Sequence, residues 1–405
     1  MRSFPLGWTR LGLVGVAVTL TTIGVLFVHS TTVGAGTTFP SSAAQAQMLK
    51  ALFAVGVFVV VSRVDYRLFG RLAYAFYGVV VATLVVLLVA KSSSDGTARW
   101  IEFPFFSIQP SELMKVAVIV VLAHYLRFRE SYRSVSGLAW PYVLVFAPMG
   151  LVALAPDLGT SLMLPPVLLA LLFVARARLW PLLVTLLVGV GSLPTAFYLR
   201  DLVPMPLHSH QFDRIAVWLQ QTDPAVLRTA AGYHLKESLI ALGSGGLTGQ
   251  GWGQGTQNKL GWLPERETDF IFSVIGEEWG FVGTACVLLL YLLLVALCIR
   301  VAIRTREPFG RLVATGVGVA FAAQSLQNIC MTMGLTPITG LPLPFVSFGG
   351  SSLVSSFLAL GLVVSVASRP VRVVASKDLD PQDLPRAVGV VERRPAGTIL
   401  SEWPV

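Results

Sequence analysis

The chain has 405 residues, of which 54% are hydrophobic and only 13% are charged. A soluble globular domain carries roughly 25% charged residues, so this composition excludes that class and indicates a membrane protein with many spans. The net charge of +9 would suggest nucleic-acid binding in a soluble protein, but here the placement of the charges gives a better explanation. Three cysteines lie inside apolar runs, which favours buried thiols over a disulfide framework or a metal site.

Ten apolar runs approach the roughly 20 residues that a helix needs to cross a bilayer. They cover residues 11–29, 49–62, 73–90, 111–126, 140–155, 159–175, 180–198, 275–299, 310–333 and 349–368. We therefore predict an all-α polytopic membrane protein with about ten transmembrane helices and one membrane domain over 1–375. The first run lacks a convincing cleavage site and is interpreted as a span. Residues 376–405 mix charges with prolines and are predicted to be a disordered cytoplasmic tail.

Basic residues are concentrated at both termini and in every even-numbered connection between the runs. The connections hold Arg63, Arg67, Arg71, Arg127, Arg129, Arg133, Arg176, Arg178, Arg300, Arg304, Arg306 and Arg311. By the positive-inside rule both termini are predicted to be cytoplasmic. The odd-numbered connections then lie on the outer face, including a large loop at 199–268, between helices 7 and 8, and a loop at 334–348. Cations on that face, such as Arg99 and Arg214, run against the bias, which favours a functional role for some of them.

Within the large outer loop, residues 211–221 have an amphipathic pattern. Ile215, Trp218 and Leu219 fall on one face of the helix that this pattern predicts. Such a helix lies either in the plane of the membrane interface or on the protein surface.

The segment 109–115, with the sequence QPSELMK, opens the fourth apolar run. Pro110 suits the first turn of a helix. Glu112 and Lys115 are three residues apart, so they share a helix face and can pair. Uninterrupted apolar residues follow Lys115, which places its ammonium group at or below the membrane surface, where a cation is a functional candidate. The alternative is an ion pair that only locks neighbouring helices together.

Other polar motifs are predicted at the same outer face. Asp157, in the turn PDLGTS, either has a functional role or caps the helix that follows it. The loop 334–348 contains prolines that forbid a regular helix. Asn328, just before this loop, is predicted to form an interhelical hydrogen bond. The motif GGSS at 349–352 opens the last run, where backbone N–H groups offer either a seat for phosphate or a plain helix start.

The segment 232–280 is the stretch around which the rest of the chain is predicted to be organised. Glycines cluster between 243 and 255, which gives a backbone that can take positive φ or approach a ligand closely. Carboxylates then stand beside or inside an apolar run, where they are costly unless they have a function. They are Glu265, Glu267, Asp269, Glu277 and Glu278.

Asp269 is the candidate general base among these carboxylates. Thr268 is predicted to cap the helix that starts there, leaving Asp269 in the first turn, where the helix dipole favours the ionised carboxylate. The apolar neighbour Phe270 acts in the opposite direction and raises the pKa of Asp269. A carboxylate held between these influences suits proton abstraction from a hydroxyl. Spacing alone leaves Glu265 and Glu278 as alternatives.

The motifs QPSELMK, PDLGTS, GYHLKESLIALGSGG, LPERETDFIF with GEEWG, GLTPITGLPLPF and SFGGSS occur in this order. In that order they resemble the SEDS family of RodA and FtsW proteins, over nearly all of the membrane part. The Gly-Tyr-His before the glycine cluster is more similar to RodA than to FtsW. The resemblance implies polymerisation of lipid II into glycan strands. It also implies a class B penicillin-binding protein as the crosslinking partner.

The resemblance makes Asp269, in TDFIF, the catalytic aspartate. It places on family motif positions, as expected substrate-binding residues, Lys115, Glu112, Gln257, Glu265, Thr268, Glu277, Glu278, Ser347, Gly349 and Ser351. With Lys115, the cations Arg99 and Arg214 are expected to offset charge on the pyrophosphate leaving group. The sequence departs from the family where Glu267 replaces a common His, and an added carboxylate is expected to raise the pKa of Asp269. No metal site and no cofactor are identified, although a divalent cation can assist this chemistry.

These expectations describe a RodA-like peptidoglycan glycosyltransferase of the plasma membrane, with its active site on the outer face and no nucleic-acid partner. The alternatives are a division-specific polymerase similar to FtsW, a lipid II flippase and a non-catalytic scaffold. A flippase needs access from both faces, whereas the carboxylates and glycines here fall on one. A scaffold leaves the clustered carboxylates unexplained.

Overall fold

The computed structural model describes residues 6–32, 39–91, 100–102, 107–128, 136–155, 157–199 and 209–369. Arg99 and the predicted tail 376–405 lie outside these ranges. Among the described residues six helices are long and apolar enough to cross a membrane. Shorter apolar helices and α5, which carries Glu112 and Lys115, account for the other predicted runs. The prediction of an all-α polytopic membrane protein is therefore confirmed.

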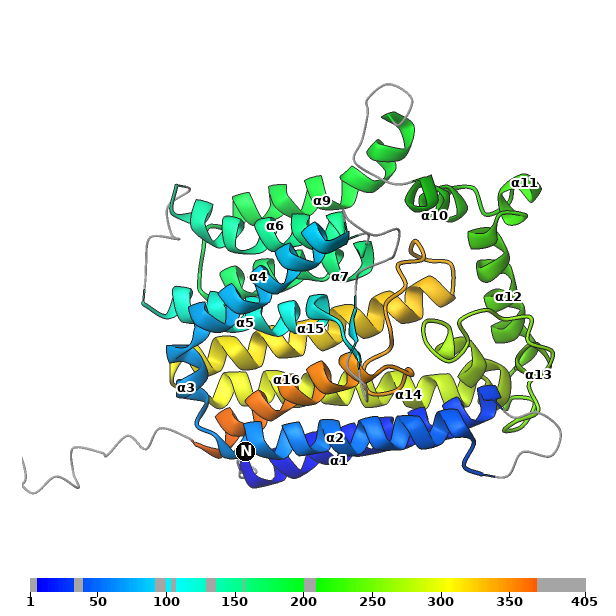
Figure 1. Cartoon of the computed structure of the whole chain (residues 1–405), viewed down its shortest axis with the longest axis horizontal. Helices are drawn as coiled ribbons and strands as arrows, with labels where there is room; N and C mark the ends of the chain where they lie inside the picture. The colour runs from blue at the N-terminus through cyan, green and yellow to red at the C-terminus, as the bar shows by residue number, and fades with distance from the viewer. Residues whose placement is uncertain are drawn as a thin grey trace, which may run out of the picture. The chain divides into compact units, whose positions relative to one another are not determined.

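Long helices aligned along a common axis form the bundle (Figure 1). The helices α1 and α2 lie along one side, α6 and α9 along the other, and α5, α15 and α16 between them. They are α1 Leu6–Thr32, α2 Ser42–Arg63, α4 Ala73–Lys91, α5 Pro110–Phe128, α6 Ala139–Leu154, α8 Leu164–Val174, α9 Leu179–Leu199, α14 Ile271–Arg304, α15 Pro308–Thr332 and α16 Gly350–Ser368. The elements between them are α3 Tyr66–Arg71, β1 Ile101–Glu102, β2 Ser107–Ile108, η2 Ser136–Leu138 and α7 Leu158–Leu162. The strands β1 and β2 pair antiparallel, with Ile101 opposite Ile108.

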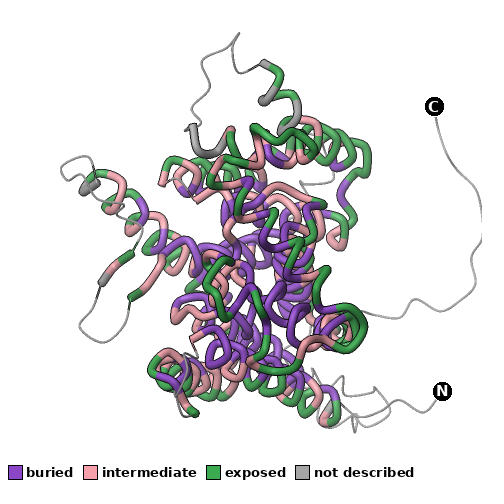
Figure 2. Tube along the Cα trace, turned by 90° about the vertical axis from the view of Figure 1, so that its right-hand side faces the viewer, coloured by how far each residue is buried: buried purple, intermediate pink, exposed green. Residues whose placement is uncertain are grey.

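The buried core runs through the middle of the bundle, where Figure 2 shows the buried stretches of the trace. In α5, every residue from Val116 to Ala123 is buried. A helix that is apolar on all sides is covered on all sides, and α5 packs against α4, α6, α8, α15 and α16. The polar residues at the start of α5 are thereby held in the centre of one end of the bundle.

The large loop predicted at 199–268 folds into short helices at that same end (Figure 1). They are α10 Ser209–Leu219, α11 Pro224–Leu227, α12 Ala230–Ser244 and α13 Thr256–Lys259. The amphipathic helix predicted at 211–221 corresponds to α10. Ile215 is buried, and the indole Nε1–H of Trp218 donates to the carbonyl of Leu335 at 3.0 Å. The Nε2 group of Gln221 donates to the carbonyl of Gly334 at 2.6 Å, so α10 is fixed to the loop 334–348.

α14 is not a continuous helix, because its backbone breaks at Gly280, where φ is 64° and ψ is −161°. A break removes hydrogen bonds that the carbonyls before it would accept within the helix. The glycine-rich loop 245–251 supplies partners instead. The N–H groups of Gln250 and Gly251 donate to the carbonyls of Glu277 and Glu278 at 2.9 and 3.0 Å, and those of Phe281 and Val282 donate to the carbonyls of Gly246 and Leu247 at 2.9 and 3.1 Å.

Glycines let this loop lie directly against α14. A Cβ atom at Gly249 would lie 2.1 Å from the carbonyl oxygen of Glu278, and one at Gly280 would lie 2.4 Å from the backbone nitrogen of Gly249. Both glycines have positive φ, and for Gly249 this agrees with the prediction for the cluster 243–255. The close approach at Gly249 is to the backbone of α14. Non-helical backbone within a membrane span is tolerated only where protein groups or a cavity satisfy it, and here the loop does so.

Candidate active site

A cavity of about 450 Å³ opens at the end of the bundle where α5, α7, α14 and α16 begin. It is lined by Trp100, Gln109, Asp157, Leu158, Arg214, Glu265, Thr268, Asp269, Thr339, Gly340, Pro342, Gly349 and Ser352. The cavity therefore brings together residues from the motifs QPSELMK, PDLGTS, LPERETDFIF, GLTPITGLPLPF and SFGGSS, but among the described residues none from GYHLKESLIALGSGG or GEEWG lines it. Its wall is mostly polar and includes three carboxylates and one guanidinium group.

The backbone at Asp269 is fixed by two side chains from other elements. The Nδ2 group of Asn328, on α15, donates to the carbonyls of Asp269 at 2.8 Å and of Leu341 at 2.7 Å. The hydroxyl of Ser347 donates to the carbonyl of Thr268 at 2.5 Å and accepts from the N–H of Leu343 at 2.7 Å. The segment 268–269 and the proline-containing loop are thus held as one unit. The sequence predicts an interhelical hydrogen bond for Asn328, but both acceptors lie in non-helical segments, so Asn328 joins α15 to the turn before α14 and to the loop 334–348.

The carboxylate of Asp269 lies beside Gly340 and Arg214. A Cβ atom at Gly340 would lie 3.2 Å from Oδ2 of Asp269 and 3.7 Å from Nη1 of Arg214. Only glycine leaves this space open, and its φ of +70° also favours glycine. The predicted general base and a predicted substrate-binding cation therefore face the same small volume.

Burial raises the pKa of Asp269 to about 6. The negative charge of Glu265, and more weakly that of Asp157, act in the same direction, whereas Arg214 and a hydrogen bond from Thr268 lower the pKa. A carboxyl group with this pKa is ionised at neutral pH and accepts a proton more readily than an ordinary aspartate. The carboxylates that raise the pKa of Asp269 are therefore Glu265 and Asp157 rather than the expected Glu267, and burial is the larger cause.

The predicted start of α14 is wrong. The helix begins at Ile271, and the N-cap residue before it, Phe270, provides no side-chain cap. The hydroxyl of Thr268 donates to the carbonyl and the carboxylate of Glu265 at 3.3 and 3.0 Å, so it does not cap the helix. Glu265 has a φ of +48°, and its carbonyl accepts the N–H groups of Thr268 and Phe270, both at 3.2 Å. Because of this turn, Asp269 lies before the first turn of α14, where the helix dipole stabilises the ionised carboxylate less.

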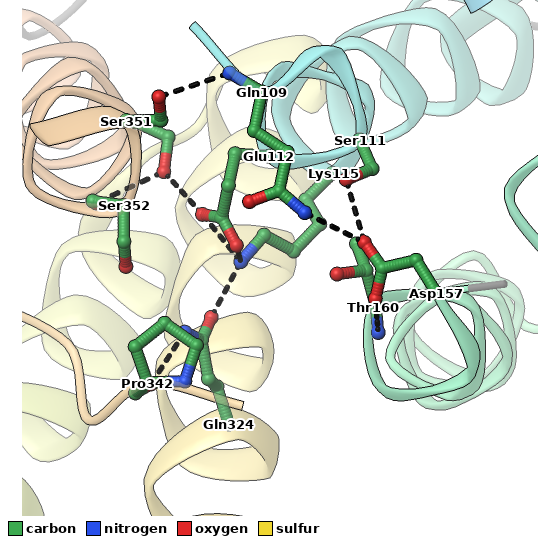
Figure 3. Close-up of polar contacts among 11 residues, drawn as sticks. Gln109, Ser111, Glu112, Lys115, Asp157, Thr160, Gln324, Pro342, Ser351 and Ser352 are labelled. Carbon is green, nitrogen blue, oxygen red and sulfur yellow. Dashed lines mark hydrogen bonds and ion pairs between the residues drawn. The ribbon is translucent and has the colours of Figure 1, made fainter. Parts of the chain in front are cut away.

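Asp157 contacts the start of α5 directly, in the wall of the cavity (Figure 3). Its Oδ2 atom accepts from Nε2 of Gln109 and from the hydroxyl of Ser111, both at 2.8 Å. Its Oδ1 atom accepts from the N–H of Thr160 at 3.2 Å and so caps α7. Capping and a place in the cavity wall, which the sequence left as alternatives, therefore occur together.

Lys115 is buried below the cavity rather than in its wall (Figure 3). Its Nζ atom lies 3.0 and 2.9 Å from the two carboxylate oxygens of Glu112 and donates to Oε1 of Gln324 at 2.7 Å. Ser355 donates to Oε2 of Glu112 at 2.8 Å, and Nε2 of Gln324 donates to the carbonyl of Pro342 at 2.8 Å. Lys115 therefore reaches the cavity through Gln324 and Pro342, and the same contacts join α5, α15 and α16.

The start of α16 forms another part of the wall. Gly349 lines the cavity, and its N–H donates to Oε1 of Gln47 at 3.4 Å. Ser351 is buried beside the cavity, where its hydroxyl accepts from the N–H of Gln109 at 2.9 Å and donates to the carbonyl of Ser107 at 2.7 Å. It is the neighbouring Ser352 that lines the cavity.

Glu277, Glu278 and Gln257 form a separate buried cluster beside the break in α14. Glu277 accepts from the N–H groups of Gln257 and Asn258 at 2.7 and 3.2 Å. Glu278 accepts from the hydroxyl of Ser30 at 2.5 Å, Nδ2 of Asn258 at 2.8 Å and the N–H of Gly253 at 2.9 Å. These carboxylates hold the loop 250–259 against α1 and α14. Their position gives no support to the expectation that they contact substrate.

Several cavity residues were not among the predicted site residues. Trp100 stands alone between motifs, and no sequence signal marks it. Gln109, Gly340 and Pro342 lie within recognised motifs and could have been chosen, because polar groups or stiff turns next to the catalytic segment indicate a shaped wall. The described residues contain no group of three or more His, Cys, Asp or Glu side chains placed to hold a metal ion. A divalent cation therefore stays a prediction.

Comparison with known proteins gives the family. A family model for FtsW, RodA and SpoVE proteins, described as "Cell cycle protein", matches residues 10–370. The chain belongs to the FtsW/RodA/SpoVE family. It is 35% identical over 376 residues to the probable peptidoglycan glycosyltransferase FtsW of Trichlorobacter lovleyi, a match that covers 91% of this chain and 95% of the relative. It is 36% identical over 310 residues to the peptidoglycan glycosyltransferase MrdB of Escherichia coli K12, covering 76% and 81%.

Solved structures agree with this family assignment. The fold is similar to a chain from a study of how a peptidoglycan synthase complex coordinates polymerization and crosslinking, with a TM-score of 0.73, 28% identity and coverage of 88% of this chain and 97% of that one. It is also similar to the rod shape determining protein RodA of Thermus thermophilus, with a TM-score of 0.64, 26% identity and coverage of 89% and 97%. The family assignment and the polar cavity therefore point to this end of the bundle as the candidate active site.

The ion pair between Lys115 and Glu112 predicts a large loss of folding stability when Lys115 is replaced by a neutral residue and the charge of Glu112 remains. Lys115→Met leaves the Glu112 carboxylate buried and unpaired, which costs about 3–5 kcal/mol of folding free energy. Adding Glu112→Gln removes that charge, so the double variant is expected to regain much of the loss. Thermal unfolding in detergent measures both, with Lys236→Met on an exposed position of α12 as the control. Equal melting temperatures for Lys115→Met and the control would contradict the pairing.

Proposed function

We propose that this chain polymerises lipid II into glycan strands, as a peptidoglycan glycosyltransferase of the RodA-like, elongation type. The observation that carries the proposal is the partly buried Asp269, with a pKa of about 6, facing Arg214 across Gly340 in the polar cavity. The family relatives named as peptidoglycan glycosyltransferases support the reaction class. Relatives named FtsW and MrdB match at similar identities, 35% and 36%, so the elongation role rests on the Gly-Tyr-His motif and on the similarity to the rod shape determining protein RodA.

In this reaction a sugar hydroxyl of the acceptor attacks the anomeric carbon of the donor. The new glycosidic C–O bond forms as the bond to the lipid pyrophosphate breaks, which inverts the anomeric carbon in one displacement. Asp269 accepts the hydroxyl proton during the attack. Arg214 lies close enough to the same volume to offset charge on the departing pyrophosphate. The products are a glycan longer by one unit, a lipid pyrophosphate and a protonated Asp269 that returns its proton to solvent.

The buried residues around the cavity have a positioning role in this proposal. Lys115 holds Gln324, which in turn holds the carbonyl of Pro342 in the cavity wall. Ser347 and Asn328 fix the backbone at Thr268 and Asp269. A general base must lie within hydrogen-bond reach of the proton it accepts. Buried residues that fix the position of the cavity wall are therefore expected to raise the reaction rate. Gln109 and Asp157 offer polar contacts to the sugars from the opposite side.

The cavity is proposed to face the outside of the cell. The basic connections, which include Arg63 and Arg306, lie at the other end of the helices, and the positive-inside rule assigns that end to the cytoplasm. A class B penicillin-binding protein is proposed as the crosslinking partner. The similarity to a chain of a complex that coordinates polymerization and crosslinking supports this partner.

Purified chain in detergent micelles is expected to convert lipid II into glycan polymer, because a polymerase needs no sided membrane. Asp269→Asn should lower the rate about 10²- to 10⁴-fold, the usual contribution of a general base. The control is Asp223→Asn, which keeps the cap on α11. Added class B penicillin-binding protein is expected to crosslink the product. Near-normal polymer from Asp269→Asn would refute the role of the base, and lipid transport without polymer would indicate a flippase.

Single cysteines test which face holds the cavity. In a variant without the three native cysteines, one cysteine is introduced at Ser244, an exposed residue at the cavity end, and another at Ser136, an exposed residue at the other end. An impermeant thiol reagent on intact cells should label position 244 and spare position 136. Lysed cells, in which both positions react, provide the control. The reverse pattern would place the cavity in the cytoplasm and exclude the proposed substrate side.

A further inference from the structure

A second hollow lies at the end of the bundle opposite the active-site cavity. It has a volume of about 740 Å³ and is formed by the first turns of α1 and the last turns of α2 and α16. Its lining residues are Gly7, Trp8, Arg10, Leu11, Val14, Phe58, Ser62, Arg63, Val364, Ser368 and Arg369. The volume falls within the roughly 300–1,000 Å³ that small-molecule sites span.

Three arginines stand around this groove, and none of its lining residues is acidic. In the part of the chain that the structure describes, no carboxylate forms an ion pair with Arg10, Arg63 or Arg369. Arg369 donates to the carbonyls of Ser62 and Ser365 and to the Ser365 hydroxyl at 2.7 Å, so its charge is held in place by neutral groups. Arg10 donates to Ser368 at 3.3 Å and is otherwise exposed. The groove therefore carries a net positive charge without an internal counter-ion.

The body of the groove is apolar. Leu11 and Val14 from α1, Phe58 from α2 and Val364 from α16 line it within the membrane-spanning parts of their helices. Trp8 is 65% exposed, and an indole at the end of a span is typical of the level of lipid headgroups. A ligand that matches this order has an anionic headgroup at the level of the arginines and hydrocarbon chains along the apolar side.

A general topological signal does not explain this arrangement. The same end of the bundle carries other exposed arginines, such as Arg178 and Arg306, that line no part of the groove. Topology requires only that positive charges lie on this side of the membrane. It does not require three guanidinium groups around one hollow with an apolar wall. Basic pockets between transmembrane helices are a known form of recognition for anionic lipid headgroups.

We propose that the groove between α1, α2 and α16 binds an anionic diacyl phospholipid, with its phosphate between Arg10 and Arg63 and its acyl chains along Leu11, Val14 and Phe58. Arginine suits the phosphate because its planar guanidinium donates two parallel hydrogen bonds. The bound lipid joins the ends of three helices. α2 and α16 carry Gln47 and Gly349, which contact each other beside the active-site cavity, at their other ends.

The proposal is tested with purified chain in detergent, by counting bound lipid molecules with native mass spectrometry during titration with phosphatidylglycerol or phosphatidylcholine. Wild type is expected to retain phosphatidylglycerol at least about tenfold more tightly than phosphatidylcholine. The double variant Arg10→Gln/Arg63→Gln should lose this preference. The matched control Arg178→Gln/Arg306→Gln removes the same charge from the same end and should keep it.

A steric variant covers the case in which the charge variant does not fold. Val14→Trp fills the apolar side while leaving every arginine in place, and it is expected to lose bound phosphatidylglycerol as well. Equal losses in the groove variants and the control would overturn the proposal in favour of general surface charge. Equal retention of the two lipids by wild type would also overturn it. Displacement of the lipid by millimolar inorganic phosphate would indicate a free phosphate site and would refute a lipid site.

Discussion

The structure depends on how a broken helix satisfies its backbone inside a membrane. The break in α14 at Gly280 frees carbonyl and N–H groups that lipid cannot satisfy. The glycine-rich loop 245–251 pairs with these groups, and Glu277 and Glu278 hold the residues that follow it. Because the loop and the break fit each other, the short segment between them, which carries Glu265, Thr268 and Asp269, is fixed at both ends. The carboxylate of Asp269, the proposed general base, owes its position to this fit.

Buried polar groups connect the cavity wall to the helices beneath it. Lys115 with Glu112 joins α5 to α15 and α16, and Gln324 continues the contact to the wall at Pro342. Asn328 and Ser347 continue it to the backbone of Asp269 and Thr268. Buried networks of this kind are costly unless every member is paired. Because these contacts end on the cavity wall and on the backbone of Asp269, they contribute to the geometry of that cavity.

The fold and the location of the site could be predicted from the sequence, because both follow from strong signals. Apolar runs mark the helices, and the motifs around Lys115, Asp157, Asp269 and Gly349 meet at the end that the charge pattern assigns to them. The roles of single residues could not be predicted in the same way. Thr268 is predicted to be a helix cap, but Glu265 has a positive φ and forms a turn with residues 268–270, and the hydroxyl of Thr268 donates to Glu265. Glu277 and Glu278 are predicted to bind substrate, but the structure places them in hydrogen bonds with the loop 250–259.

The most direct test of this account is the pH dependence of glycan polymerisation. Because burial and Glu265 raise the pKa of Asp269 to about 6, the rate should rise with pH as Asp269 ionises and level off near neutral pH. Glu265→Gln removes a charge that raises this pKa, so the midpoint should move to lower pH. Burial lowers the pKa of the nearby His234, and a His234→Asn variant should retain the rise. A rate that stays constant between pH 5 and pH 7, or a midpoint unmoved by Glu265→Gln, would contradict the assignment of Asp269 as the general base.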